Sequence, residues 1–267
     1  MDSTTSIAQL AAFDFIDALK RSESWTIMAW GELAARYGRT LIGAAWNMVI
    51  FGAFCIVIIT LFGSLQPDLD FEFGPYVVIG FLVFTLLSSI LTDATGVYIT
   101  NQGWMKGMLL PYGFYIYKGL MRNLIIFGYN LIAAILILVF YYDFQPNTAQ
   151  LYILAAIPIY LINGITANIL LGAICVRYRD IVQIVGIFTR FSLFITPIMW
   201  TADRGGIRGL FAQYNPLTHF IEIVREPILH GTVPQQSWMI VMTVTVSLIV
   251  ICVPVYAITR RRLIYWL

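Results

Sequence analysis

The chain has 267 residues, of which 60% are hydrophobic and only 11% are charged. Soluble globular domains carry about a quarter charged residues, so this composition excludes that class. Several apolar runs of about 20 residues instead indicate an all-α membrane protein with several spans and no separate soluble domain. The net charge of +2 is small, so the positions of the charges are more informative than their sum.

Residues 1–40 precede the first apolar run and are predicted to be a cytoplasmic or interfacial segment. The segment begins acidic and lacks the basic and then apolar regions that are typical of a cleaved signal peptide. An apolar stripe recurs within it at helical spacing, made of Ile27, Trp30, Leu33 and Tyr37. Glu32 and Arg36 stand in the i,i+4 order that favours an ion pair on a helix. We therefore expect an amphipathic helix in the headgroup plane, with a solvated leader helix as the alternative.

Six apolar segments are predicted to form a transmembrane domain over residues 41–259. They cover about residues 41–62, 75–100, 119–142, 149–176, 181–202 and 237–258. The fourth segment is expected to be broken by Pro158 and Gly164. The connection between the fifth and sixth segments is polar, but its apolar residues between Pro216 and Gly231 recur at helical spacing and predict a short amphipathic helix. Residues 260–267 form the predicted cytoplasmic tail.

The distribution of basic residues predicts the orientation of these spans. With the N-terminus inside, 13 of the 16 lysines and arginines lie on or near the cytoplasmic side. Arg204, Arg208 and Arg225 remain outside. The positive-inside rule therefore places both termini in the cytoplasm.

A compact charged turn, Arg177-Tyr178-Arg179-Asp180, separates the fourth and fifth spans. The two arginines alone would serve as a positive-inside anchor, but the tyrosine and the aspartate have no part in that role. A turn with both signs of charge suits contact with a protein surface, because opposite charges can specify register. The anchor and the docking site remain alternatives from the residues alone.

Two charged residues fall within predicted spans, Asp93 in the second and Arg190 in the fifth. Charged residues inside a membrane usually face a bundle interior or a wet cavity and pair with one another. Both positions lie toward the cytoplasmic side, so we predict an Asp93–Arg190 pair or a polar cavity that the two residues share.

Aromatic residues are frequent in the first and fifth spans. The candidates for a substrate path are Trp46, Phe51, Phe54, Phe188, Phe191, Phe194 and Trp200. A ring face can stack on the apolar face of a sugar, although contact with lipid or the protein core is the commoner role of any single ring.

Motifs of catalysis are absent from the sequence. It has no HExxH, GxSxG or phosphate-binding GxxxxGK[ST] motif, and its two histidines are isolated. The three cysteines lie far apart in apolar runs and predict neither a disulfide framework nor a metal site. We expect no catalytic residue, no metal and no cofactor on this chain, so uphill transport would need ATP and Mg²⁺ on a partner subunit.

Several segments together resemble a known family. They are LAARYGRTLIGAAW at 33–46, then Asn101, Lys106 and Pro111, then VRYRDIVQIV with the later TPIMW, and YNPLTHFIEIVREPILHG at 214–231. In this combination the chain resembles the membrane subunits of polysaccharide-exporting ABC transporters. The O-antigen permeases (Wzm) and teichoic-acid permeases (TagG) are nearer, and the capsule permeases (KpsM) are more distant.

The resemblance implies a homodimer of six-span subunits in the bacterial inner membrane, bound to two cytoplasmic ATPase subunits of the Wzt type. It implies that Asn101, Lys106 and residues 177–180 couple to the ATPase. It also implies that residues 203–231 form re-entrant periplasmic helices. Spans one and five would line the path of a lipid-linked glycan, most simply an O-antigen, with teichoic acid or capsule as the alternatives. No contact with nucleic acid is expected. A glycolipid-modifying enzyme is the rival from another class, and it would need clustered acids or histidines near a membrane face.

Overall fold

The computed structural model describes residues 7–63, 73–108, 110–141, 147–201 and 206–266, and every regular element in these ranges is helical. The prediction of an all-α protein is therefore confirmed. The elements are α1 (Ile7–Lys20), α2 (Ser22–Tyr37), η1 (Gly43–Ala45), α3 (Trp46–Phe62), α4 (Phe73–Gly96), α5 (Gln102–Gly107), α6 (Tyr112–Tyr141), η3 (Thr148–Leu151), α7 (Tyr152–Arg177), α8 (Asp180–Ile195), α9 (Gly206–Tyr214), α10 (Pro216–Leu229) and α11 (Gln235–Trp266).

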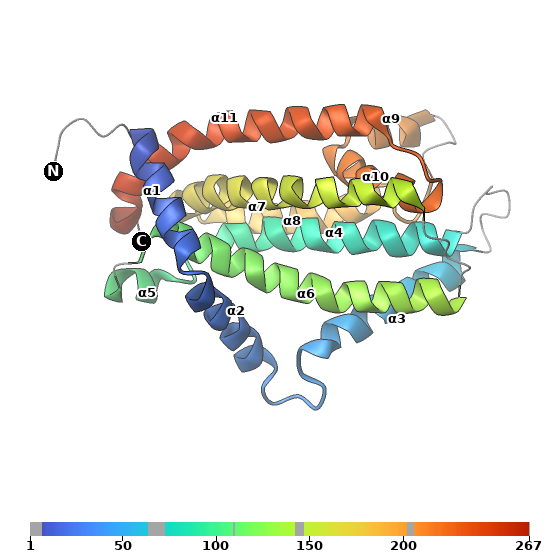
Figure 1. Ribbon diagram of the computed structural model, residues 1–267, viewed down its shortest axis with the longest axis horizontal. Helices are drawn as coiled ribbons and strands as arrows, with labels where there is room; N and C mark the ends of the chain where they lie inside the picture. The colour runs from blue at the N-terminus through green and yellow to red at the C-terminus, as the bar shows by residue number, and fades with distance from the viewer. Residues whose placement is uncertain (1–6, 64–72, 109, 142–146, 202–205, 267) are drawn as a thin grey trace.

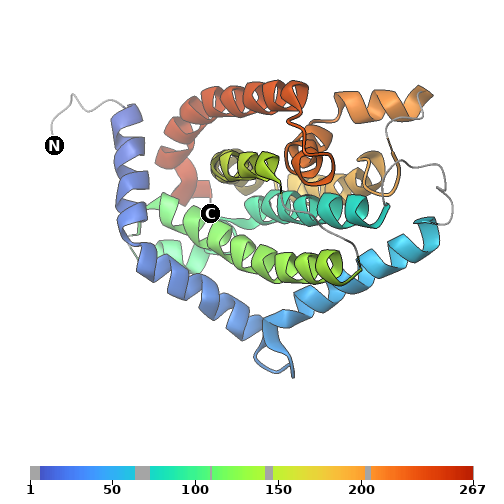
Figure 2. The ribbon, with the colours of Figure 1, turned by 45° about the vertical axis from the view of Figure 1, so that its right-hand side comes forward.

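The long helices α4, α6, α7, α8 and α11 run along a common direction and pack into one bundle (Figures 1 and 2). Helices α1 and α5 and the last turns of α11 lie at one end, which we call the α5 end. Helices α9 and α10 lie at the opposite end, which we call the α10 end. The chain thus returns its first and last helices to the same end of the bundle.

Five helical segments within the described residues are long and apolar enough to cross a membrane. They are Gly43–Phe62, Phe73–Gly96, Tyr112–Phe140, Thr148–Arg177 and Gln235–Arg260. The remaining predicted span corresponds to α8, which has only 16 residues. At 1.5 Å per residue α8 is about 24 Å long, short of the roughly 30 Å hydrocarbon core of a bilayer. The structure therefore supports five spans by length and composition.

The observed helices differ from the predicted ones in three places. Helix α7 continues through Pro158 and Gly164 without a break, as membrane helices can when their neighbours satisfy the freed backbone groups. The predicted N-terminal helix is two helices, α1 and α2, separated at Arg21. The segment 101–117, which lies between the second and third predicted spans, contains α5 and the first turns of α6.

The predicted amphipathic helix after Pro216 is confirmed as α10. The side chain of Asn215 accepts a hydrogen bond from the backbone amide of Leu217, which caps the helix, and Pro216 fills the first turn, where its missing amide costs nothing.

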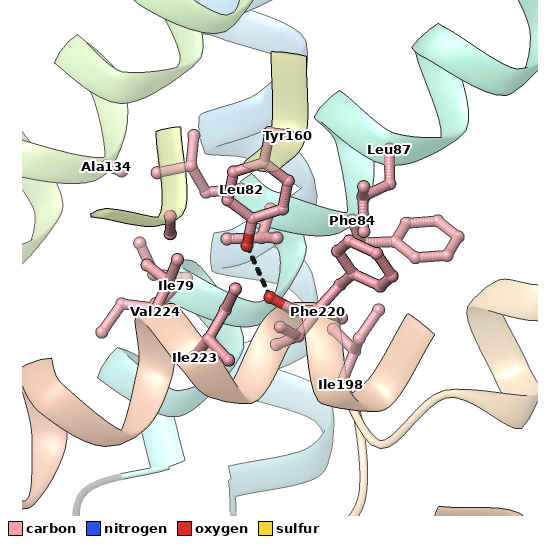
Figure 3. Packing of buried hydrophobic residues seen from close by; sticks show 14 of the residues in the cluster. Ile79, Leu82, Phe84, Leu87, Ala134, Tyr160, Ile198, Phe220, Ile223 and Val224 are labelled. Atoms are coloured by element: carbon pink, nitrogen blue, oxygen red, sulfur yellow. Dashed lines mark hydrogen bonds between the residues drawn. The ribbon is translucent and has the colours of Figure 1, made fainter. Parts of the chain in front are cut away.

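Helix α4 is the central element, because α3, α6, α7, α8 and α10 all pack on it. The chain directly after α4 also lies close to α7: a Cβ atom at Gly172 would lie 2.6 Å from Cγ1 of Val97. Figure 3 shows the core toward the α10 end, where the Tyr160 hydroxyl donates a hydrogen bond to the Phe220 carbonyl, 2.5 Å away. Gly172 thus allows α7 to lie close to the end of α4, and the Tyr160 hydrogen bond joins α7 to α10.

Arg225 of α10 is a buried cation at this end of the bundle, with 2% of its surface exposed. Its guanidinium lies 3.7 Å from the centre of the Tyr76 ring and donates to the Pro197 carbonyl, 2.7 Å away. Glu222, one turn earlier on α10, forms an ion pair with it. The hydroxyl of Tyr76 donates to the same carbonyl at 3.0 Å. Arg225 therefore fastens the chain after α8 to α4 and α10.

Replacing this cation should destabilise the fold strongly. In Arg225→Met the Glu222 carboxylate loses its charged partner, and breaking a buried pair costs about 3–5 kcal/mol. The unfolding midpoint of the variant in mixed micelles should fall well below that of the wild type. Arg208→Met, at an exposed arginine of α9, is the control and should change little. Equal midpoints for the two variants would contradict this role of Arg225.

Candidate functional site

Helix α5 presents an exposed surface at its end of the bundle. Trp104 is 51% exposed and Lys106 is exposed, whereas Met105 between them is buried against the bundle. The helix has only six residues, so packing at its two ends must hold it in place. The two residues predicted to couple to an ATPase in this segment thus differ: Lys106 faces outward, and Asn101 is buried with 6% exposed.

Asn101 directly precedes α5 and is held by its side-chain amide. Its Nδ2 atom donates to the carbonyl of Val97, 2.7 Å away, and its Oδ1 atom accepts a hydrogen bond from the ammonium of Lys118. Lys118 is only 1% exposed and also pairs with Glu32 of α2. A buried ammonium is costly unless it is paired and hydrogen-bonded, so these two partners stabilise its position.

Two further residues extend this arrangement. Arg122, one turn after Lys118 on α6, pairs with Oε2 of Glu32 at 2.5 Å and with Oδ2 of Asp93 at 2.8 Å. Two acids and two bases from α2, α4 and α6 therefore form a neutral charge network. We call Glu32, Asp93, Lys118 and Arg122 the four-charge network.

The four-charge network corrects two predictions. Asp93 pairs with Arg122, and among the described residues it forms no ion pair with Arg190, which is exposed on α8. Glu32 turns inward to Lys118 and Arg122, and the predicted pair with Arg36 is not among the ion pairs of the described residues. In both cases a base on α6 lies nearer in space than the partner expected from the sequence.

The apolar stripe predicted on α2 is split for the same reason. Leu33 is buried against the bundle with 1% exposed, whereas Ile27 and Trp30 are more than half exposed. Because Glu32 and Leu33 are adjacent, the helix turns one side toward α6 and keeps a separate apolar side outward.

The pKa of Glu32 responds to this environment. Burial by itself would raise the pKa, but the hydrogen bond and charge of Lys118, together with the charge and hydrogen bond of Arg122, lower it below its ordinary value of 4.5. The carboxylate is therefore held in its charged form at neutral pH.

A second carboxylate, Asp14 of α1, binds the first residues of α6. It accepts hydrogen bonds from the backbone amides of Tyr112 at 3.3 Å and Gly113 at 3.0 Å, so it caps the N-terminus of α6 from a different helix. Tyr256 of α11 donates to the same carboxylate at 2.6 Å, and Arg260 lies 3.7 Å away. The start of α6 is thus tied to both α1 and α11.

All four residues of the charged turn between α7 and α8 are exposed. Arg177 ends α7 and Asp180 begins α8, where a negative side chain favours the helix dipole. Tyr178 is 61% exposed, and the Arg177 guanidinium lies 5.6 Å from the centre of its ring. No ion pair within the described residues involves Arg177, Arg179 or Asp180. These side chains remain available to an external surface.

The predicted aromatic path divides into two groups. On α3, Phe51 is buried and Phe54 is partly buried, and both stack on Phe81 of α4 with ring centres 5.4 and 4.1 Å apart. On α8, three exposed rings follow one side of the helix: Phe188, Phe191 and Phe194. Phe51 is therefore a core residue of this subunit, and the α8 rings form an uncovered aromatic face.

The two tryptophans occupy the flanks of these groups. Trp46 begins α3 and is 42% exposed. Trp200 is partly buried after α8, and its indole donates to the Phe194 carbonyl, 2.9 Å away. An apolar cavity of about 530 Å³ lies elsewhere, between α4, α6 and α7, and none of the predicted site residues lines it.

Sequence reasoning missed three members of the site: Asp14, Lys118 and Arg122. The signal for the two bases was their i,i+4 spacing at the beginning of an apolar run, where two charges on one side of a helix need partners. Asp14 gave no such signal, because a carboxylate that caps a distant helix leaves no local pattern.

Comparison with known proteins places these features in a family context. The model of the family described as ABC-2 type transporter matches residues 23–229, a range that begins in α2 and ends with α10. Two proteins from Escherichia coli, both called polysialic acid transport protein KpsM, are 24% and 23% identical to the chain over 216 residues. The aligned region covers 76% of this chain and 80% of each of those proteins. The family match includes the whole four-charge network, α5 and the charged turn.

The lowered pKa of Glu32 predicts a dependence of stability on pH. The stabilisation is present above the ordinary value of 4.5 and is lost as the pH falls through the lowered value, because the protonated acid no longer pairs with Lys118 and Arg122. Unfolding midpoints of the wild type and Glu32→Gln should differ most at neutral pH and converge as the pH falls below 4.5. Glu23→Gln, at an exposed acid of the same helix, is the matched control. A difference that stays constant over this range would contradict the pairing.

Proposed function

Because the chain belongs to the ABC-2 type transporter family, we propose that it is the permease subunit of an ATP-driven exporter of a lipid-linked polysaccharide. The protein is a membrane component of a transporter, and its named relatives are transport proteins for polysialic acid. The exporter would move the glycan from the cytoplasm toward the periplasm across the bacterial inner membrane.

One observation carries the proposal: the exposed charged turn Arg177–Asp180. Three charged side chains without ion pairs among the described residues, next to an exposed tyrosine, suit contact with a protein of complementary charge. The sequence has no ATP-binding motif, so an ATPase subunit must supply the energy, with ATP and Mg²⁺ bound there. Helix α5, with Trp104 and Lys106 outward, would be the second contact.

The proposed topology has six spans, with α8 as the fifth. Helix α8 runs beside α4 within the bundle, and the bent segment Thr196–Trp200 would complete its crossing. The α5 end would face the cytoplasm, because it carries Lys106, Lys118 and Arg122 together with the charged turn. Helices α1 and α2 would lie in the headgroup plane, and α9 and α10 would enter the membrane from the periplasmic side.

The uncovered aromatic face of α8 supports a homodimer with a glycan path between its subunits. An exposed row of rings on a helix is a natural surface for a second subunit or a sugar chain. Rings that stack on sugars without many buried hydrogen bonds would let a polymer slide. Phe188, Phe191 and Phe194 would line this path, with Trp46 and Trp200 near its ends.

The cargo proposed first is an O-antigen, on the form of the Thr196–Trp200 segment. A capsular glycan is the second candidate, because the relatives with printed names transport polysialic acid. Teichoic acid or another lipid-linked glycan remains in the same class. A glycolipid-modifying enzyme is not favoured, since no group of three or more histidine, cysteine or acidic side chains that could hold a metal occurs in the described parts of the chain.

The docking role of the charged turn can be tested by reversing one charge. Asp180→Arg should weaken co-purification with the ATPase subunit and reduce export, because a like charge then meets the basic partner of Asp180. The variant should still insert in the membrane, since Asp180 is exposed and unpaired among the described residues. Arg208→Glu, at the α10 end, is the control with the same size of charge change. Normal co-purification and export with Asp180→Arg would overturn the docking role.

The aromatic path makes a separate prediction. Phe191→Ala should lower the rate of glycan export by roughly tenfold or more, because one stacked ring contributes about 1–3 kcal/mol in comparable ring contacts. Phe191→Trp should retain export. Phe211→Ala, at an exposed ring of α9, is the control. Export is measured as glycan reaching the outer surface, and equal export from Phe191→Ala and the wild type would remove α8 from the path.

A further inference from the structure

Carboxylates of the N-terminal helices act on both sides of α5: Glu32 on the residue before it, through Lys118, and Asp14 on the start of α6. At its start, Glu32 of α2 reaches Asn101 through the buried ammonium of Lys118. At the following junction, Asp14 of α1 accepts the backbone amides of Tyr112 and Gly113. The six residues of α5 therefore lie between two attachments to α1 and α2.

Lys118 makes the first attachment mechanically firm. It is 1% exposed, its ammonium has both Glu32 and Asn101 as partners, and the Tyr115 ring lies 6.0 Å away. If Asn101 moved away from Lys118, or Glu32 moved alone, a buried cation would lose a partner in a place with little water to replace it. Asn101, the residue before α5, and helix α2 are therefore expected to move together with the first turns of α6.

The attachment continues into the centre of the bundle. Glu32 is shared between Lys118 and Arg122, and Arg122 also binds Asp93 of α4. Helix α4 is the element on which α3, α6, α7, α8 and α10 all pack. Charge-assisted hydrogen bonds thus run without a gap from Asn101, the residue before α5, through Glu32 of α2 to Asp93 of the central helix α4.

From this geometry we infer that α2 is a third coupling element, which transmits a displacement of α5 through Glu32 to α4. The inference rests on the proposed function, since it requires an ATPase that displaces α5. In this role Glu32 is a positioning residue: it touches neither the glycan nor ATP, and it determines whether α2 follows α5. The ATPase would displace α5 through its exposed face, and the ion pairs of the four-charge network would transmit this displacement to α2 and α4.

The functional arm of the test compares two acids on one helix. In the reconstituted complex with its ATPase subunit, Glu32→Gln should lower the glycan exported per ATP hydrolysed by roughly tenfold, the effect of losing one charge-assisted hydrogen bond. Glutamine keeps the shape and an acceptor oxygen, so the variant should fold. Glu23→Gln should leave the ratio unchanged. An unchanged ratio in Glu32→Gln would overturn the inference.

The structural arm measures the movement itself. The three native cysteines are buried, so spin labels can be placed selectively at exposed positions. One pair, Gly103→Cys with Gln236→Cys, reports α5 against the start of α11, and a second pair, Ala34→Cys with Gln236→Cys, reports α2 against the same reference. Electron paramagnetic resonance distances are compared with and without ATP in the complex.

The expected result is that ATP changes both distances in the wild type, and that Glu32→Gln abolishes the α2 change while keeping the α5 change. If α5 responds in the wild type but α2 does not, the inference is wrong and the proposed function stands. If neither label responds, the proposed contact between α5 and an ATPase is wrong as well. The two failures are therefore distinguishable.

Discussion

The structure depends on the need to neutralise a lysine that lies almost wholly inside the protein. Lys118 occupies the first turns of a helix that crosses most of a membrane, where an unpaired ammonium would be costly. Its partners come from α2 and from the residue before α5, so the charge joins both of these helices to α6. Arg122, one turn later, repeats the arrangement with Glu32 and Asp93. At the α5 end these charges stand beside an apolar core that includes Met105, Phe114 and Leu120.

The opposite end follows the same principle with different chemistry. Arg225 is also buried, but it binds a main-chain carbonyl and an aromatic face in addition to one acid. It therefore fixes a bend in the chain after α8, whereas the four-charge network joins whole helices. The first end therefore links α2, α4 and α6 through their side chains, and the second holds a backbone segment after α8.

Much of the fold was predictable, because apolar periodicity and length specify membrane helices directly. The helix after Pro216 was found from its spacing, and the α7–α8 turn from its charges. The partners of the charges could not be predicted, since Asp93 and Arg122 are 29 residues apart and meet only through the packing of α4 on α6. The exposure of the α8 rings and the burial of Phe51 likewise depend on which side of each helix faces α4. The fifth span was predicted from apolar composition alone, whereas α8 ends at Ile195, just before Thr196 and Pro197.

The bond between Asp14 and Tyr256 joins residues 242 positions apart. It can close only after nearly the whole chain has been synthesised, although Asp14 itself is made among the first residues. Until then Asp14 can accept the first amides of α6 but lacks its contacts with Tyr256 and Arg260. The contacts at the start of α6 are therefore complete only when α11 has formed. A truncated chain would reach the membrane without the bonds from Tyr256 and Arg260 to Asp14 at that end. A complete subunit and a fragment would differ at the very place where a partner is proposed to bind.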